Sequence, residues 1–185
     1  MIEYWAVSSR PSSLKTKLKD EKMKRNNKTT LFLTRAGMIA AIYVALTFIS
    51  AMMGLSSGAI QLRLSEAMCL LPLIFPEAIV GLTLGCALAN LLTGCVFWDI
   101  VFGSVATLIG ALGAYLLRRL PEKYEFVATI PTILANAIIV PFVLQFAYGI
   151  QDGYWFLFMT VGIGEVLSAG VMGTFLYKNL KKVFL

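Results

Sequence analysis

The chain has 185 residues, of which 58% are hydrophobic and only 14% are charged, and its formal net charge is +6. A soluble domain carries about 25% charged residues, so this composition predicts an integral membrane protein with a single membrane domain. The basic residues lie near the chain ends and in one loop rather than on a folded basic face. This distribution argues against a nucleic-acid-binding protein.

Cofactor and metal sites are not indicated by the sequence. Histidine is absent, and the cysteines Cys69, Cys86 and Cys95 lie in apolar runs without metal-binding or paired spacing. No GxxxxGK[ST] motif occurs, so the chain has no P-loop with which to hydrolyse ATP. We therefore expect no metal, no cofactor and no catalytic residues.

Residues 1–33 are polar and basic and are predicted to form a disordered cytoplasmic tail. Met23 would itself be a natural start, so we expect the 22 residues before it to be either an upstream-start artefact or a dispensable extension. Residues 34–180 are predicted to form the membrane domain, and residues 181–185 a short cytoplasmic end.

The predicted membrane domain contains six apolar segments, read at about 20 residues per helical span. They are residues 34–53, 62–75, 76–94, 98–117, 126–147 and 154–177. The second segment is short, and Pro72, Pro76 and Glu77 interrupt it and the next one. A five-span or re-entrant arrangement is therefore the alternative at that point.

Basic residues also predict the orientation of these spans. With six spans and both ends in the cytoplasm, fifteen of the sixteen Lys and Arg residues lie inside, and only Arg63 lies at the outer mouth. Trp98, Tyr148, Tyr154 and Trp155 then fall at the outer interface, where amphipathic rings prefer to lie. The sequence thus predicts an all-α integral membrane protein, a bundle of six transmembrane helices with cytoplasmic N- and C-termini.

A ligand site is indicated by Arg63 and Glu66, which follow a stretch without charge that begins after Arg35. A charge at the centre of a membrane helix costs about 2.5–3.5 kcal/mol on insertion scales, so such residues are usually paired, hydrated or functional. Residues three apart share a helix face. Arg63 and Glu66 are therefore expected to pair or to line one polar cavity together.

Other polar residues at membrane depth allow two interpretations each. Glu165 lies in the middle of the last segment and either contacts a ligand or pairs with Arg63. Asn90 and Asn136 either hold helices together or bind a ligand. Asp99 and Glu77 fit acids near helix N-termini, which is a structural role. Because no nucleophile–base pair is present, recognition fits better than catalysis.

Small residues form two overlapping faces in the first segment. Such faces allow membrane helices to approach closely. Two faces are more than one neighbouring helix requires, so packing inside the bundle and docking to another membrane subunit are both open. The candidate docking residues are Ala36, Gly37, Ala40, Ala41 and Ala45.

Several motifs occur in a fixed order along the chain: residues 58–66 (GAIQLRLSE), 71–72 (LP), 75–79 (FPEAI), 85–91 (GCALANL) and 99–108 (DIVFGSVATL). Together they resemble the queuosine precursor transporter (QueT) family. The resemblance covers about residues 34–180. Proteins of this family are substrate-binding (S) components of energy-coupling factor (ECF) transporters.

This resemblance implies a six-helix S component in the bacterial cytoplasmic membrane, with a ligand cavity at its outer face. Its partners would be a transmembrane coupling subunit, docked on the small residues of the first helix, and two ATPase subunits. The implied substrate is a 7-deazaguanine base such as preQ1, preQ0 or queuine. The candidate substrate-binding residues are Gln61, Arg63, Glu66, Asn90, Asp99, Asn136, Glu165, Trp98 and Trp155.

Physical chemistry suggests roles for these residues. A guanine-like edge offers adjacent N–H donors that a carboxylate accepts as a bidentate pair, which favours Glu66 or Glu165. Gln61 or Asn136 would then meet the base carbonyl, and Arg63 would hold the acid in place. A cationic aminomethyl group would seek Asp99 or Glu66. Aromatic side chains would stack on the ring or anchor the protein at the membrane interface; they are Trp98, Tyr154 and Trp155.

Three other functions are compatible with the sequence. The first is an S component for another vitamin or nucleobase. The second is a proton-coupled secondary transporter acting alone, with its spaced acids as a relay, although no inverted repeat is visible. The third is a membrane scaffold that uses its small-residue faces and binds no ligand.

Overall fold

A computed structural model describes residues 12–55 and 61–184, and all the regular elements in these two ranges are helices. The chain divides into two compact units, Met1–Thr34 and Arg35–Leu185. Helix α2 (Ser12–Met52) begins in the first unit and ends in the second. The division lies one residue from the boundary that we expected between the tail and the membrane domain.

The described part of the first unit is helical, which differs from the disordered tail predicted for residues 1–33. Helix α2 runs without Gly or Pro from Ser12 to Ala36 and is rich in Lys and Leu, which favour helices. The hydroxyl of Thr29 donates to the carbonyl oxygen of Arg25 at 3.2 Å. Residues 1–11, the beginning of the predicted tail, lie outside the described residues, as do 58–60 of the GAIQLRLSE motif.

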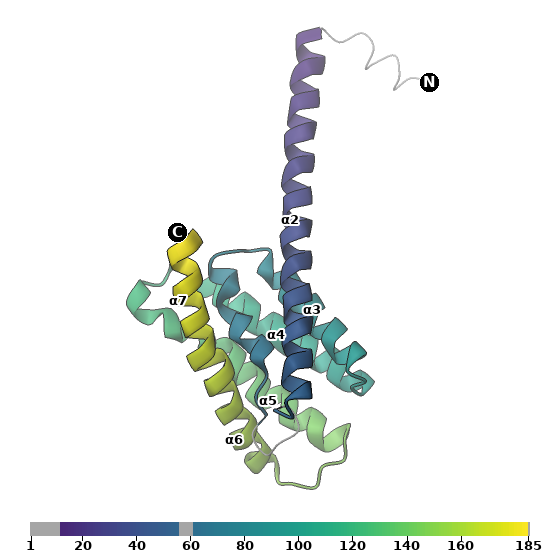
Figure 1. Ribbon diagram of the computed structural model, residues 1–185, viewed down its shortest axis with the longest axis vertical. Coiled ribbons are helices and arrows are strands. Elements are labelled where there is room, and N and C mark those ends of the chain that lie inside the picture. Colours follow the sequence, from purple (N-terminus) through teal and green to yellow (C-terminus); the bar gives the residue numbers. More distant parts are fainter. Residues whose placement is uncertain (1–11, 56–60, 185) are drawn as a thin grey trace. The chain divides into compact units, whose positions relative to one another are not determined.

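The second unit contains the remaining helices, which Figure 1 shows in chain order. Each predicted apolar segment overlaps a helix or a contiguous set of helices, so the prediction of an all-helical protein is confirmed. In Figure 1, α6, η4 and α7 follow one another without a break. The bounds are η1 (Leu64–Leu73), α3 (Ala78–Leu92), α4 (Phe97–Leu116), η2 (Leu117–Arg119), η3 (Glu122–Thr129), α5 (Ile130–Phe146), α6 (Tyr154–Glu165), η4 (Val166–Met172) and α7 (Gly173–Phe184).

Within the described ranges, four helical stretches are long and apolar enough to cross a membrane: Met23–Met52, Phe97–Arg119, Lys123–Phe146 and Tyr154–Phe184. The apolar helices η1 and α3 are shorter. With its 15 residues, α3 extends over roughly 22 Å at the rise of an α-helix. The 3₁₀ helix η1, with 10 residues, extends over roughly 20 Å. Both are shorter than the hydrocarbon core of about 30 Å.

The short helix η1 is enclosed by protein, because residues 65–72 are all buried. It packs against α4, α7 and the π-helical segment η4. A β-carbon added at Gly173 of α7 would lie 3.2 Å from the carbonyl oxygen of Ala67. Irregular backbone at membrane depth is tolerated where protein surrounds it, which explains how this segment accommodates Pro72 and 3₁₀ geometry.

Small residues bring neighbouring helices into close contact. A β-carbon at Gly81 of α3 would lie 2.7 Å from the carbonyl oxygen of Ala36, and one at Gly85 would lie 2.9 Å from Cβ of Tyr43. The predicted small face of the third segment therefore packs against α2. Likewise, Gly110 of α4 lies directly against Thr132 of α5.

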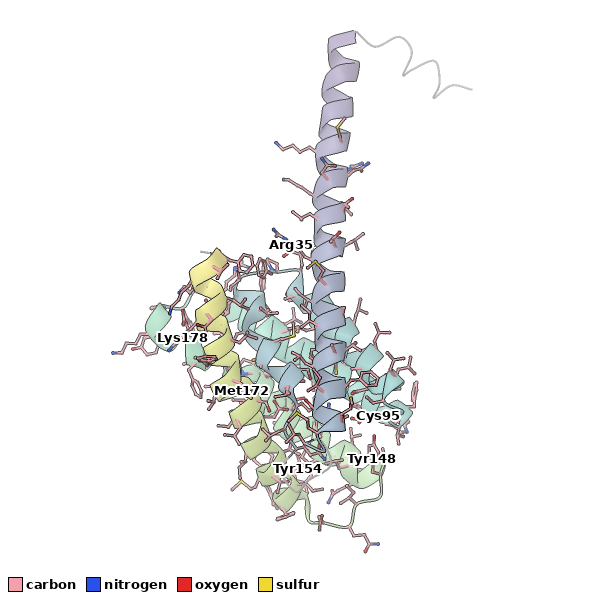
Figure 2. The ribbon with its side chains drawn as sticks, viewed as in Figure 1. Arg35, Cys95, Tyr148, Tyr154, Met172 and Lys178 are labelled. Atoms are coloured by element: carbon pink, nitrogen blue, oxygen red, sulfur yellow. The ribbon has the colours of Figure 1, made fainter. Side chains whose placement is uncertain are left out.

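The surface of the second unit is largely apolar, as a lipid-facing surface requires. Large exposed side chains include Leu84, Leu88, Ile109 and Phe142. Figure 2 shows Arg35 and Lys178 toward one end of this unit, and Cys95, Tyr148 and Tyr154 toward the other. The candidate polar residues gather toward the second of these ends.

Candidate functional site

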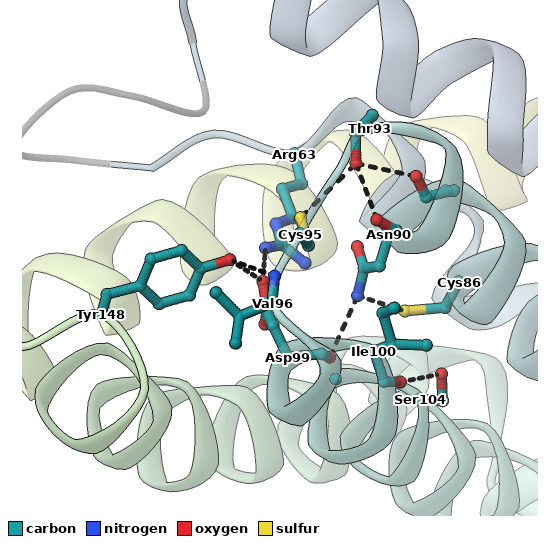
Figure 3. Close-up of polar contacts among 12 residues, drawn as sticks. Arg63, Cys86, Asn90, Thr93, Cys95, Val96, Asp99, Ile100, Ser104 and Tyr148 are labelled. Carbon is teal, nitrogen blue, oxygen red and sulfur yellow. Dashed lines mark hydrogen bonds and ion pairs between the residues drawn. The ribbon is translucent and has the colours of Figure 1, made fainter.

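Polar side chains from α3, α4 and two connecting segments form what we call the outer cluster: Arg63, Asn90, Asp99 and Tyr148 (Figure 3). The Asp99 carboxylate accepts a hydrogen bond from the Tyr148 hydroxyl at 3.0 Å, and its Oδ2 lies 4.0 Å from Nη2 of Arg63. Nδ2 of Asn90 donates to the backbone carbonyl oxygen of Asp99 at 3.2 Å. The outer cluster thus joins three of the predicted site residues.

The charges in the outer cluster reinforce one another. Burial and then the Asp99 carboxylate raise the pKa of the Tyr148 hydroxyl above its usual value, so this hydroxyl stays protonated and donates. The half-buried Arg63 guanidinium faces the Asp99 carboxylate, and this opposite charge favours its charged form.

A second group, the inner cluster, comprises Tyr43, Glu66, Asn136 and Glu165, which come from α2, η1, α5 and α6. All four are buried, with Glu66 2% and Glu165 6% exposed. The hydroxyl of Tyr43 donates to Oε1 of Glu66. Asn136 lies beside both carboxyl groups, and Arg63 is near enough to interact with each of them. Arg63 is therefore common to both clusters.

Two polar atoms of the inner cluster have no hydrogen-bond partner, although both are buried. They are Nδ2 of Asn136 and Oε2 of Glu165. The Asn136 amide lies close to the carboxyl groups but does not reach good hydrogen-bond geometry with either. An unsatisfied buried polar group costs about 1–3 kcal/mol, so native proteins rarely retain one without a reason. The inner cluster is therefore suited to receive a polar ligand.

The space beside Glu66 is narrow. Tyr43, Cys69, Leu82, Thr107 and Thr132 surround it together with Glu66, and it has no room for a water molecule. Oγ1 of Thr132 is another buried polar atom without a partner. The clusters are thus closely packed in this structure, and a ligand of nucleobase size requires side chains to separate.

The backbone of Gln61 lies directly against Gly164, the residue before Glu165. A β-carbon at Gly164 would collide with the carbonyl oxygen of Gln61, so only glycine allows the segment before η1 to lie against α6 here. The π-helical segment η4 begins directly after Glu165. Such segments occur frequently at functional sites. Gln61, which the sequence predicts as a site residue, therefore lies next to the inner cluster.

Two predicted site residues lie outside both clusters. Trp98 is 54% exposed, stacks on Phe102 and lines an apolar groove of about 280 Å³ between α4 and α5. Trp155 is 76% exposed. Neither indole faces the inner cluster, so the alternative interpretation, an aromatic anchor at the membrane interface, suits them better.

Sequence reasoning missed Tyr43 and assigned Tyr148 only to the membrane interface. Tyr43 had a weak signal, since it is the one residue between Ala40 and Ala45 with a polar group in its side chain. Tyr148 combines both roles, because its ring is half-exposed while its hydroxyl contacts Asp99. Glu77 directly precedes α3, as predicted for an acid near a helix N-terminus, but its side chain pairs with Arg35 at 3.2 Å and does not cap the helix.

Chemically, these clusters offer hydrogen-bond acceptors, amide groups and one guanidinium. Within residues 12–55 and 61–184, no group of three or more acidic or cysteine side chains is placed to hold a metal ion. The described clusters also contain no nucleophile beside a base. Their arrangement is suited to recognition of a ligand with several N–H groups.

Comparison with known proteins adds to this picture. Residues 33–182 match the family described as QueT transporter. The Queuosine precursor transporter QueT of Lactococcus lactis subsp. cremoris (strain MG1363) is 26% identical over 152 residues, which cover 78% of this chain and 89% of that protein. No solved structure gives a significant match.

Proposed function

Because the chain belongs to the QueT transporter family and is therefore a transporter and not an enzyme, we propose that it captures a queuosine precursor, a 7-deazaguanine base. The relative from Lactococcus lactis is named for transport of queuosine precursors. In this proposal the chain is the S component of an ECF transporter in the bacterial cytoplasmic membrane. It binds the base at the outer face and releases it inward with its partners.

The observation that carries this proposal is the unsatisfied inner cluster. Asn136 Nδ2 and Glu165 Oε2 lack partners, while Glu66 is buried beside them. A 7-deazaguanine ring presents a carbonyl group next to N–H and NH₂ groups, which complements an amide and a carboxylate. In this arrangement Asn136 donates to the carbonyl group, and a carboxylate accepts the N–H pair.

Arg63 and Gln61 complete the proposed site. Arg63 interacts with Asp99 across 4.0 Å and lies near Glu66, so it keeps the acids in position. Gln61 lies against Gly164, next to Glu165. The outer cluster then acts as a support between the ligand and the outer surface. Asn90 belongs to this support through its bond to Asp99.

The proposed topology has six membrane crossings with both termini in the cytoplasm. Four helices have sufficient length, and η1 and α3 supply the two shorter crossings. Burial of η1 within protein supports this assignment, because lipid contact is not required of it. The basic residues Arg35 and Lys178 lie at the end opposite to the outer cluster, as the positive-inside rule requires (Figure 2).

Energy would come from partners, namely a transmembrane coupling subunit and two ATPase subunits. The predicted docking residues on α2 divide into two groups. Ala36 and Ala40 are buried against α3 and are therefore occupied by internal packing. Gly37, Ala41 and Ala45 are exposed. We assign docking to these three, which leave room for a closely packed helix.

Equilibrium binding to the purified full-length protein tests the substrate assignment. Aminomethyl 7-deazaguanine, cyano 7-deazaguanine and queuine are titrated while tryptophan fluorescence is followed, with thiamin and riboflavin as controls. Saturable binding of at least one deazaguanine, without ATP or partners, is expected. Binding of a control vitamin alone would contradict the substrate assignment.

Uptake measurements test the partner assignment separately. Gly37→Leu together with Ala41→Leu should leave ligand affinity unchanged and abolish uptake in cells that contain the ATPase partners. Met38→Leu is the matched control, because Met38 is exposed on the same helix. Uptake that continues without any ATPase would instead indicate a secondary transporter.

A further inference from the structure

The two clusters contain more acids than bases. Their acidic side chains are Glu66, Asp99 and Glu165, and within the described residues the only basic side chain among them is Arg63. Other basic residues are engaged elsewhere: Arg35 pairs with Glu77 at 3.2 Å. Figure 2 shows Arg35 and Lys178 far from the outer cluster. The candidate site therefore has more acidic than basic side chains.

These acids differ in their partners. Asp99 has both Arg63 and Tyr148, and Glu66 accepts the hydroxyl of Tyr43. Glu165 forms no ion pair with any described residue, and its Oε2 has no hydrogen-bond partner. Glu165 is also 94% buried, since 6% of its surface is exposed. Arg63 is its nearest basic group but forms no direct ion pair with it. A buried carboxyl oxygen without a hydrogen-bond partner is unfavourable unless a ligand supplies one.

We propose, on the basis of the function proposed above, that the ligand carries one positive charge and that its ammonium group pairs with Glu165. Glu66 then accepts the N–H groups of the ring on the opposite side of Asn136. In this arrangement Glu165 is the residue that selects a cationic base over a neutral one with the same ring. The site thus distinguishes the aminomethyl precursor from the cyano precursor.

Chemistry of the two precursors makes them a suitable pair of probes. A primary amine such as that of lysine has an ordinary pKa of about 10.4, so an aminomethyl group is expected to be protonated at neutral pH. The cyano group is neutral, and the 7-deazaguanine ring is the same in both. A difference in affinity between them therefore reports how the site treats the charge.

The experiment measures dissociation constants of both bases with the wild-type, Glu165→Gln and Glu77→Gln proteins. For the wild type, the aminomethyl base should bind at least about tenfold more tightly, since a charge-assisted hydrogen bond contributes about 1.5–3 kcal/mol. Glu165→Gln should remove this preference, so that the ratio of the two dissociation constants falls to within about threefold of one. Glu77→Gln, the matched control at the opposite end, should keep the preference.

The possible outcomes distinguish the selection of a cationic base by Glu165 from the proposed capture of a 7-deazaguanine base. Equal affinities of the wild type for the two bases, or tighter binding of the cyano base, would overturn the inference and leave the proposed function standing. A preference that persists in Glu165→Gln would overturn the assignment to this residue. Absence of binding for every deazaguanine would overturn both. The wild-type comparison remains decisive if Glu165→Gln does not fold.

Discussion

The acidic side chains at the two ends of the bundle differ in how many basic partners they have. At the end that carries Arg35, two acids have basic partners: Glu77 pairs with Arg35 at 3.2 Å, and Glu125 with Lys181 at 2.8 Å. At the other end, Asp99, Glu66 and Glu165 share the single guanidinium of Arg63.

Charges that pair within the fold therefore lie at one end, and those proposed to bind a ligand lie at the other. Arg35 is 44% exposed at its side chain, so its ion pair is partly hydrated and contributes little to stability. The inner cluster is buried and incompletely satisfied, which costs free energy in the absence of a ligand. Because the unsatisfied polar groups lie at only one end, we propose that the polar ligand binds at that end.

The largest effect on ligand binding is expected from a substitution of Glu66. Glu66→Gln keeps the size of the side chain and an acceptor for Tyr43 but removes the charge. It should weaken binding of a deazaguanine base by well over tenfold, because charge-assisted hydrogen bonds contribute about 1.5–3 kcal/mol. Titration of the purified variant measures this. Unchanged affinity would remove Glu66 from the site.

Asn136 offers a test in which binding and stability change independently. Asn136→Leu removes an amide whose Nδ2 has no partner, so thermal stability should stay the same or rise. Ligand affinity should fall about tenfold if the amide contacts the base. Calorimetry and ligand titration on the same sample measure the two effects.

Asn90→Leu is the matched control for this variant, because the Asn90 amide already donates to the Asp99 carbonyl oxygen. This substitution should lower the free energy of unfolding by about 0.5–1.5 kcal/mol. If Asn136→Leu were destabilised as much as Asn90→Leu, the Asn136 amide would be structural and not reserved for a ligand.

Tyr148→Phe tests the outer cluster separately from the inner cluster. It removes the hydrogen bond to Asp99 and the one that the hydroxyl accepts from the Val96 amide, but it leaves the ring and the inner cluster in place. Affinity should fall only about threefold, since these are supporting hydrogen bonds, each contributing about 0.5–1.5 kcal/mol mainly to stability. A loss as large as that of Glu66→Gln would place Tyr148 in direct contact with the ligand.

The smallest effect is expected at the paired end. Arg35→Gln removes the partner of Glu77 and should change the free energy of unfolding by less than about 1 kcal/mol, as for other exposed ion pairs. Ligand affinity should stay within the error of the titration. A marked loss of affinity would show that the Arg35–Glu77 pair influences the proposed ligand site, and that the two ends do not act independently.

The helical segments were largely predictable from the sequence, because long apolar runs interrupted by Pro, Gly and charges determine where membrane helices begin and end. Segments 62–75 and 76–94 were recognised as the weak pair, and η1 and α3 are indeed shorter than the other helices. The 3₁₀ geometry of η1 was not predictable, since it depends on burial by α4, α7 and η4. Residues 12–33 were predicted to be disordered because of their high charge. They are helical, so their helix propensity was given too little weight.

For the site, the sequence by itself determined which residues are unusual: acids, amides and an arginine at membrane depth carry a cost wherever the chain places them. Only the tertiary structure decided how they are grouped. It separated Asp99, with its two partners, from Glu165, whose Oε2 has none, and it added Tyr43. The physical reason is that a charged residue can be recognised from the sequence alone, whereas its ion-pair and hydrogen-bond partners come from helices that are distant in the sequence.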